Sequence, residues 1–337
     1  MTPLDYGNRA AAGRVKQIVG YLVIALVLAF MGRSLYLNWQ TLQGYHWQFN
    51  YPLLAAAVLA ALVTLSLYAW MWYVIIRRLG GQISYWQAFR IWFLANLGRY
   101  IPGKIWQFVG WFYLGEQAGL GRVQILTSIA VNLGLQTLTG LGLGVVMLAL
   151  GLGGDLLNHF WPLLLLVPLG TLFAVRPNIL EFMLNWGLVK LGREPVKLGL
   201  RTGDMILFTF GHAGCWVVYG VAFYLFVCSL QPLPIRDLPV LGATYAAAWV
   251  IGFLSFLTPG GIGVREGVLA YLLGFWLPAP VAIVISLLSR VWVTAGELIG
   301  IAIAWRLGPA IRPKENLNAK PPSCEEKQKP QMNRGRG

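Results

Sequence analysis

The sequence predicts an all-α, polytopic membrane protein. Hydrophobic residues occupy 57% of the 337 positions and charged residues only 11%, whereas about a quarter of the residues in an ordinary soluble domain are charged. The apolar residues gather in long runs, each close to the roughly 20 residues that a helix needs to cross a bilayer. Some runs are unbroken, and others are interrupted by Pro-Gly pairs. We therefore expect about six full transmembrane helices and two broken, re-entrant hairpins.

Each of the six unbroken runs is expected to form one transmembrane helix. They cover residues 17–37, 52–76, 124–150, 160–175, 205–229 and 280–305. The first run follows a basic N-terminal segment, residues 1–16, as the apolar core of a signal peptide would. It is longer than such a core and has no clear small-x-small cleavage site. We interpret it as an uncleaved first span.

Two further regions, residues 85–115 and 238–277, contain a Pro-Gly pair and charged residues within apolar sequence. Proline and glycine pull the backbone out of helical geometry, and backbone groups without partners cannot face hydrocarbon. We expect each region to enter the bilayer, break inside a protein-enclosed space and return on the same side. The alternative is a short turn outside the bilayer. The predicted break residues are Pro102, Gly103, Pro259, Gly260, Gly261 and Gly263.

The distribution of Lys and Arg predicts the topology, because cytoplasmic loops are enriched in both. The basic segments are the N-terminus, the Arg77-Arg78 pair, Arg122, residues 176–201 and the tail 306–337. The connecting loops with at most one basic residue are 45–51, 153–159 and 231–239. We expect an inner (plasma) membrane protein with both termini in the cytoplasm and a disordered basic tail. The first hairpin then opens to the cytoplasm and the second opens outward.

The two membrane halves, residues 17–150 and 160–305, each contain two spans, a hairpin and a further span. Their orientations are opposite, which suggests an inverted repeat. Interrupted segments at matching positions of two inverted halves point to the central site of a transporter. Chance resemblance is the alternative, since proline and glycine are common in membrane helices.

Charged residues cluster around both breaks and in the last span. Ionisable groups at membrane depth are costly and mark functional sites by default. Two of them, Arg290 and Glu297, are seven residues apart and share one helix face, and Arg290 is expected to pair with Glu266. The alternatives are a purely structural ion pair and, for Lys104, a side chain that reaches the headgroups. The candidate substrate-binding residues are Arg99, Lys104, Arg265, Glu266, Arg290 and Glu297.

Other classes of function have little support in the sequence. The three histidines are scattered, the three cysteines lack metal-ligand spacing, and no nucleotide loop or nucleophile arrangement is present. We expect no catalytic residue, metal or cofactor. The net charge of +14 is spread over loops and the tail rather than over one soluble surface, which argues against nucleic acid.

Three segments carry a resemblance to a known family: LGRYIPGKIW at 97–106, TPGGIGVREG at 258–267, and Ser289-Arg290 in the last span. With them the chain resembles the family named for the transmembrane region of lysylphosphatidylglycerol synthase, over nearly all of its length up to about Arg306. The resemblance implies a flippase-like module for lipids. The soluble aminoacyl-transferase domain of the synthase is not expected here, so the resemblance does not extend to synthase activity.

Two hypotheses follow for the function. The first is a lipid translocator whose cations bind an anionic headgroup or phosphate, on an anionic or aminoacylated phospholipid or on a polyprenyl or glycolipid-type envelope lipid. The second is a non-catalytic accessory subunit of an envelope lipid or glycan biosynthesis enzyme, such as a glycosyltransferase, in which the charges only hold helices together. An intramembrane enzyme has the weakest support. The oligomeric state stays open.

Overall fold

The computed structural model describes residues 47–100, 105–151, 175–190, 197–255 and 261–307, together with 39–45 and a few single positions elsewhere. All regular secondary structure in these residues is helical. This confirms the predicted all-α membrane protein. The N-terminal segment 1–16 and most of the tail 306–337 lie outside the described residues.

Five helices in the described ranges are long and apolar enough to cross a membrane. They are α3 (Tyr51–Arg78), α6 (Arg122–Gly151), α9 (Thr202–Cys228), α10 (Leu238–Leu254) with the 3-10 turn η2 (Ile235–Asp237) before it, and α12 (Ala279–Leu307). Four of them match predicted runs. The predicted spans 17–37 and 160–175 lie almost entirely outside the described residues.

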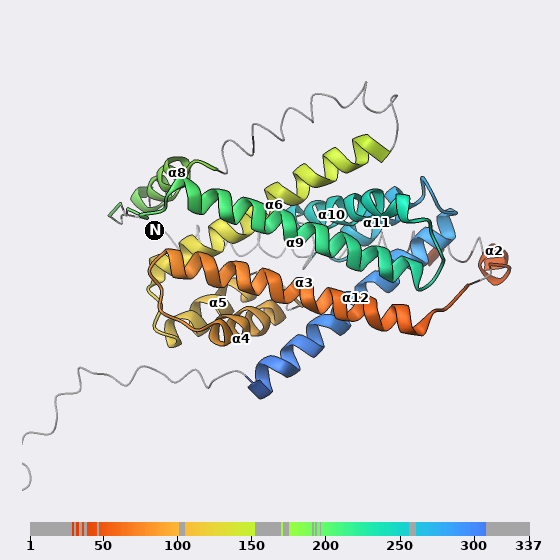
Figure 1. Cartoon of the computed structure of the whole chain (residues 1–337), viewed down its shortest axis with the longest axis horizontal. Helices are drawn as coiled ribbons and strands as arrows, with labels where there is room; N and C mark the ends of the chain where they lie inside the picture. The colour runs from red at the N-terminus through yellow and green to blue at the C-terminus, as the bar shows by residue number, and fades with distance from the viewer. Residues whose placement is uncertain are drawn as a thin grey trace, which may run out of the picture.

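The first predicted hairpin is a pair of short helices separated by a break. It consists of α4 (Tyr85–Asn96), a 3-10 turn η1 (Leu97–Tyr100) and α5 (Trp106–Gln117). Each arm has 12 residues, or about 18 Å at 1.5 Å per residue, which is too short to cross. The chain enters α4 through a capping box, in which Ser84 and Gln87 each bond the other's backbone N–H. The helices α4 and α5 pack against each other and lie beside the C-terminal half of α3 (Figure 1).

The second hairpin differs from the prediction in one arm. Together with η2, α10 covers 20 residues, about 30 Å of helix, so it is long enough to cross the bilayer alone. The reason is that Pro239 falls in the first turn of α10, where proline is tolerated, and no other breaker interrupts the helix before Ser255. The return arm α11 (Val264–Leu273) has only 10 residues and packs along α10.

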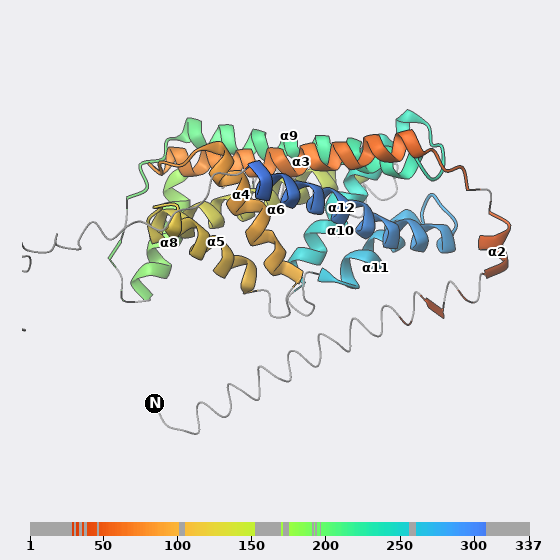
Figure 2. The ribbon, with the colours of Figure 1, turned by 90° about the horizontal axis from the view of Figure 1, so that it is seen from below.

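The helices pack around an aromatic core. In this core α3 lies against α9, α10 lies against α6 and α9, and α12 contacts α3, α4 and α11 (Figures 1 and 2). The buried rings of Tyr219, Tyr245 and Trp292 contact one another, with centroids 4.8 to 6.1 Å apart. Because lipid gives helices no hydrophobic reason to associate, such packing and interhelical hydrogen bonds hold the bundle together. Both α12 and α6 contact the two hairpins: α12 through α4 and α11, and α6 through α5 and α10.

The closest approach between α9 and α10 depends on two glycines. A Cβ added to Gly220 would lie 3.1 Å from the Cα of Gly242, and one added to Gly242 would lie 3.0 Å from the Cα of Gly220. Because each added Cβ would meet a backbone Cα atom, no flexible side chain could move aside to make room for it. Small residues at such crossings let membrane helices approach.

We predict that Gly220→Val destabilises the protein by about 1–3 kcal/mol, the usual cost of overpacking a close contact. Gly214→Val is the matched control, because Gly214 lies in the same helix and has no heavy atom within 4 Å of its added Cβ. Thermal unfolding in detergent should show a lower Tm for Gly220→Val only. Equal Tm values for the two variants would contradict the packing.

Candidate functional site

The second hairpin turns through glycines in a backbone conformation that other residues rarely adopt. Gly261 has φ +70° and Gly263 has φ +85°, both in the left-handed region that glycine tolerates without strain. A Cβ on Gly261 would lie 2.5 Å from the carbonyl oxygen of Gly252, so a side chain has no room there either. Gly261 and Gly263 therefore lie in the break of the second hairpin, as the sequence predicts. The other predicted break residues and one predicted cation lie outside the described residues: Pro102, Gly103, Lys104, Pro259 and Gly260.

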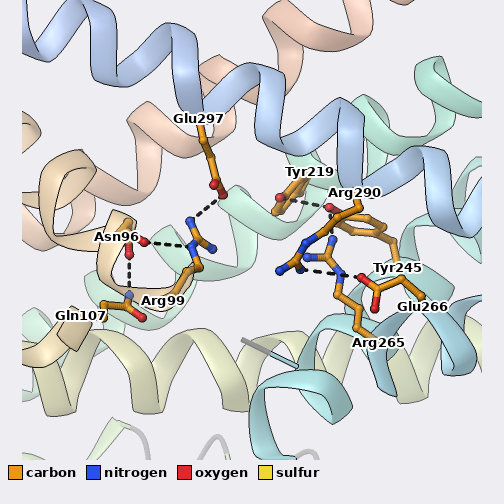
Figure 3. Close-up of polar contacts among 9 residues, drawn as sticks. All are labelled: Asn96, Arg99, Gln107, Tyr219, Tyr245, Arg265, Glu266, Arg290 and Glu297. Atoms are coloured by element: carbon orange, nitrogen blue, oxygen red, sulfur yellow. Dashed lines mark hydrogen bonds and ion pairs between the residues drawn. The ribbon is translucent and has the colours of Figure 1, made fainter. Parts of the chain in front are cut away.

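An ion pair ties the first hairpin to α12. Arg99 lies in η1 at the end of α4, and its Nη2 is 2.5 Å from Oε1 of Glu297. The Nε of the same side chain donates to the carbonyl oxygen of Asn96 at 3.3 Å, which orients the guanidinium toward α12 (Figure 3). Glu297 is only 5% exposed. The break of the first hairpin is thus held against the middle of the last span.

A second ion pair ties the second hairpin to the same helix. The Nη1 of Arg290 lies 3.7 Å from Oε1 of Glu266, which confirms the predicted pairing. The other carboxylate oxygen of Glu266 accepts a 2.7 Å hydrogen bond from the backbone N–H of Gly263. This contact caps α11 and places a negative charge at its N-terminus, where the helix dipole favours one. Glu266 therefore joins the turn, α11 and α12.

The third arginine is held by tyrosines. Arg265 is buried, and its guanidinium carbon lies 4.8 Å from the centre of the Tyr245 ring. Its Nη2 also donates to the hydroxyl of Tyr245, which itself donates to the hydroxyl of Tyr219 at 3.1 Å. Cation–π contact and a charge-assisted hydrogen bond together fix the guanidinium in place. Sequence reasoning missed both tyrosines, since aromatic residues in an apolar span give no sign of where their hydroxyls point.

A side-chain hydrogen bond closes the break of the first hairpin. The amide nitrogen of Gln107, at the start of α5, donates to the amide oxygen of Asn96, at the end of α4. Gly98 permits this approach, because a Cβ there would lie 2.5 Å from the backbone nitrogen of Gln107. Neither residue is among the site residues predicted from the sequence. The two residues hold α4 and α5 in the geometry that presents Arg99.

The site lies near the middle of α12. Arg290 comes 11 residues after Ala279, and Glu297 comes 10 residues before Leu307, so each is about 15–17 Å from its nearer helix end. That is about half of the roughly 30 Å hydrocarbon thickness. Figure 3 shows Arg99 on one side and Arg265 with Arg290 on the other, around one region beside α12. Five of the six predicted site residues thus lie beside the central part of α12, in two neighbouring groups.

The five described site residues carry one formal positive charge in excess, since three are arginines and two are glutamates. Arginine keeps its proton in proteins, and a buried charge without a counter-charge is strongly unfavourable. An anionic group at this position would therefore be stabilised. The described residues contain no group of three or more His, Cys, Asp or Glu side chains placed to hold a metal ion.

The sequence model of the lysylphosphatidylglycerol synthase TM region matches residues 17–299. The chain belongs to this family. The matched range includes both hairpins and every residue of the site, and it ends two residues after Glu297. No curated protein matches the chain. Family membership and the five apolar helices together identify a multi-pass membrane protein of a family that handles lipids.

We predict that Glu297→Gln destabilises the protein by about 1–3 kcal/mol, because it leaves the partly buried guanidinium of Arg99 beside a neutral amide. The double variant Arg99→Gln with Glu297→Gln should lose less stability than the sum of the two single variants, since it removes both charges of the pair together. Unfolding of the purified proteins in detergent gives the change in the free energy of unfolding for each single variant and for the double variant.

The control for this cycle is the exposed pair of Arg122 and Glu116, whose side chains are 69% and 41% exposed. Removing an exposed pair usually changes stability by at most about 1 kcal/mol. Additive losses at Arg99 and Glu297 would show that the two residues do not interact across the hairpin and α12.

Proposed function

We propose that the protein translocates a lipid with an anionic headgroup between the leaflets of the membrane. The observation that carries the proposal is the excess positive charge at mid-depth, placed where both broken hairpins meet α12. Phosphate oxygens accept paired hydrogen bonds from a guanidinium. A headgroup that enters the site therefore exchanges its hydration for contacts with Arg99, Arg265 and Arg290. The proposal assigns the protein no chemical reaction and requires no cofactor.

The two ion pairs give this proposal a mechanism. Each joins a hairpin to α12, and the hairpins are predicted to open on opposite sides of the membrane. A headgroup phosphate competes with Glu266 for Arg290 on one side and with Glu297 for Arg99 on the other. The pair of Arg290 and Glu266 is the looser, at 3.7 Å against 2.5 Å. Breaking one pair at a time would open one side while the other stays closed.

The remaining charged residues have distinct roles in the proposal. Arg265 keeps its position through Tyr245 and is the fixed contact for the headgroup, while Arg99 and Arg290 exchange partners. Lys104, which follows Gly103 in the sequence, is proposed to add a further cation for the headgroup. Once released, Glu266 and Glu297 can bind an ammonium group, which an aminoacylated headgroup carries.

We also infer the orientation from the basic residues. Arg77 and Arg78 end α3, Arg122 begins α6, and Arg78 pairs with Asp204 at the start of α9, 2.9 Å away. All of these lie at one end of the bundle, and the positive-inside rule assigns that end to the cytoplasm. The chain is then a plasma membrane protein with cytoplasmic termini, and its partners are membrane lipids of the cell envelope.

We predict that Arg265→Gln slows headgroup-selective translocation without unfolding the protein, because the neighbouring tyrosines can bond the new amide. In proteoliposomes, dithionite reduction of a fluorescent phosphatidylglycerol should be faster with the wild-type protein than in empty vesicles. The variant should be slower by about 10- to 100-fold, the equivalent of one hydrogen bond to a charged group at about 1.5–3 kcal/mol. Phosphatidylcholine is the control lipid and Arg122→Gln the control variant. Equal rates for Arg265→Gln and wild type would refute the proposed role.

We predict that each single variant, Glu266→Arg or Arg290→Glu, impairs folding, because it places two like charges together. The double variant exchanges the charges of the pair and should restore folding but not translocation. The exchange keeps an ion pair between α11 and α12. It removes the Glu266 carboxylate that caps α11, and it moves the cation from position 290 on α12 to position 266 on α11. Size-exclusion elution reports folding, and the dithionite assay reports translocation. Recovery of both would instead show that this pair only connects helices and takes no part in headgroup binding.

A further inference from the structure

The helix α8 (Pro177–Lys190) lies outside the packed bundle. It has 14 residues, about 21 Å, which is too short to cross a bilayer. Figure 1 shows it beyond the N-terminal end of α9, and Figure 2 shows it running across the direction of α3 and α9. No helix in the described part of the chain packs extensively along it. A helix of this length is marginal in water, so its surroundings must stabilise it.

One face of α8 exposes large apolar side chains. Phe182 is 71% exposed, Trp186 59% and Val189 60%. They are four and three residues apart, a spacing that places all three on one side of a helix. Exposing such a face to water at the end of the bundle would be unfavourable, because hydrating large apolar side chains costs free energy.

Basic residues surround this apolar face. Arg176 precedes the helix and Lys190 ends it, with its Nζ 4.0 Å from the centre of the Trp186 ring. Glu181 accepts a 3.3 Å hydrogen bond from the backbone nitrogen of Leu198. This bond ties α8 to the segment that carries Lys197. Tryptophan favours the headgroup level, and basic residues beside a membrane attract anionic lipids.

We infer that α8 lies in the plane of the membrane at this end of the bundle, bound to anionic lipid. Phe182, Trp186 and Val189 insert among the upper acyl carbons, while Arg176 and Lys190 contact headgroup phosphates. A short helix with an apolar face and flanking cations has the features of an interfacial helix. The exposed face and its cations carry this inference, and it does not depend on the translocation proposal.

Spin labels on single cysteines test the inference in the full chain. The reference protein replaces the native cysteines (Cys215→Ala, Cys228→Ala, Cys324→Ala) and is reconstituted in vesicles of phosphatidylcholine with or without phosphatidylglycerol. Labels are placed at Phe182→Cys and Val189→Cys. The lipid-facing reference is Phe210→Cys in α9, which is 71% exposed, and the water-facing reference is Arg236→Cys, whose side chain is 85% exposed. Collision rates with oxygen and with a water-soluble nickel complex are measured at each position.

The labels at 182 and 189 should resemble the reference at 210, with oxygen collisions several-fold above nickel collisions. Phosphatidylglycerol should raise this ratio, and Arg176→Gln with Lys190→Gln should remove the increase. Ratios like that at 236 would overturn the inference, because α8 would then lie in water. Low collision rates with both reagents would also overturn it, because a protein would then cover the face. A high ratio that phosphatidylglycerol does not change would overturn the anionic selectivity.

Discussion

The cost of placing charge in hydrocarbon governs the architecture of this protein. The helix α12 carries Arg290 and Glu297 near its middle, and neither can face lipid at that depth. Each obtains its partner from a different hairpin, Glu266 from the second and Arg99 from the first. The turn η1 of the first hairpin and the first turn of α11 in the second must therefore lie at the depth of these two residues. The short arms, the 3-10 turn and the glycine turn all serve this placement.

The glycines make that placement sterically feasible. Gly252 brings α10 close to α11, since a Cβ there would lie 2.7 Å from the Cβ of Arg265. Gly261 and Gly98 permit equally close contacts at the two breaks. Irregular backbone is tolerated at membrane depth only where protein surrounds it, and these contacts provide that enclosure. The same contacts place Arg99 and Arg265 close to the helices that carry their partners.

The sequence predicted the features that follow from the cost of burial and missed those that depend on side-chain direction. The partner of Arg290 was predictable, because a deep arginine requires a carboxylate and Glu266 follows a break. The partner of Arg99 was not, since nothing in the sequence aligns η1 with Glu297 on α12. Tyr245 and Tyr219 were indistinguishable from other aromatic residues in apolar spans. The region 238–277 was predicted to be a re-entrant hairpin, yet its first arm, with η2, is long enough to cross the bilayer.

The charges are distributed unequally between the two halves. The predicted inverted repeat makes α6 the counterpart of α12, as the last span of its half. Yet the described residues of α6 contain one ionisable side chain, Arg122, at the start of the helix. Its buried polar residues Asn132 and Gln136 instead bond His212 and Trp216 of α9, the latter through a backbone carbonyl. If the halves share an architecture, their charges are arranged differently. The helix α6 packs against α5, α9 and α10, and its Arg122 pairs with Glu116 of α5 at an exposed position. The helix α12 instead pairs with both hairpins through Glu297 and Arg290 near its middle.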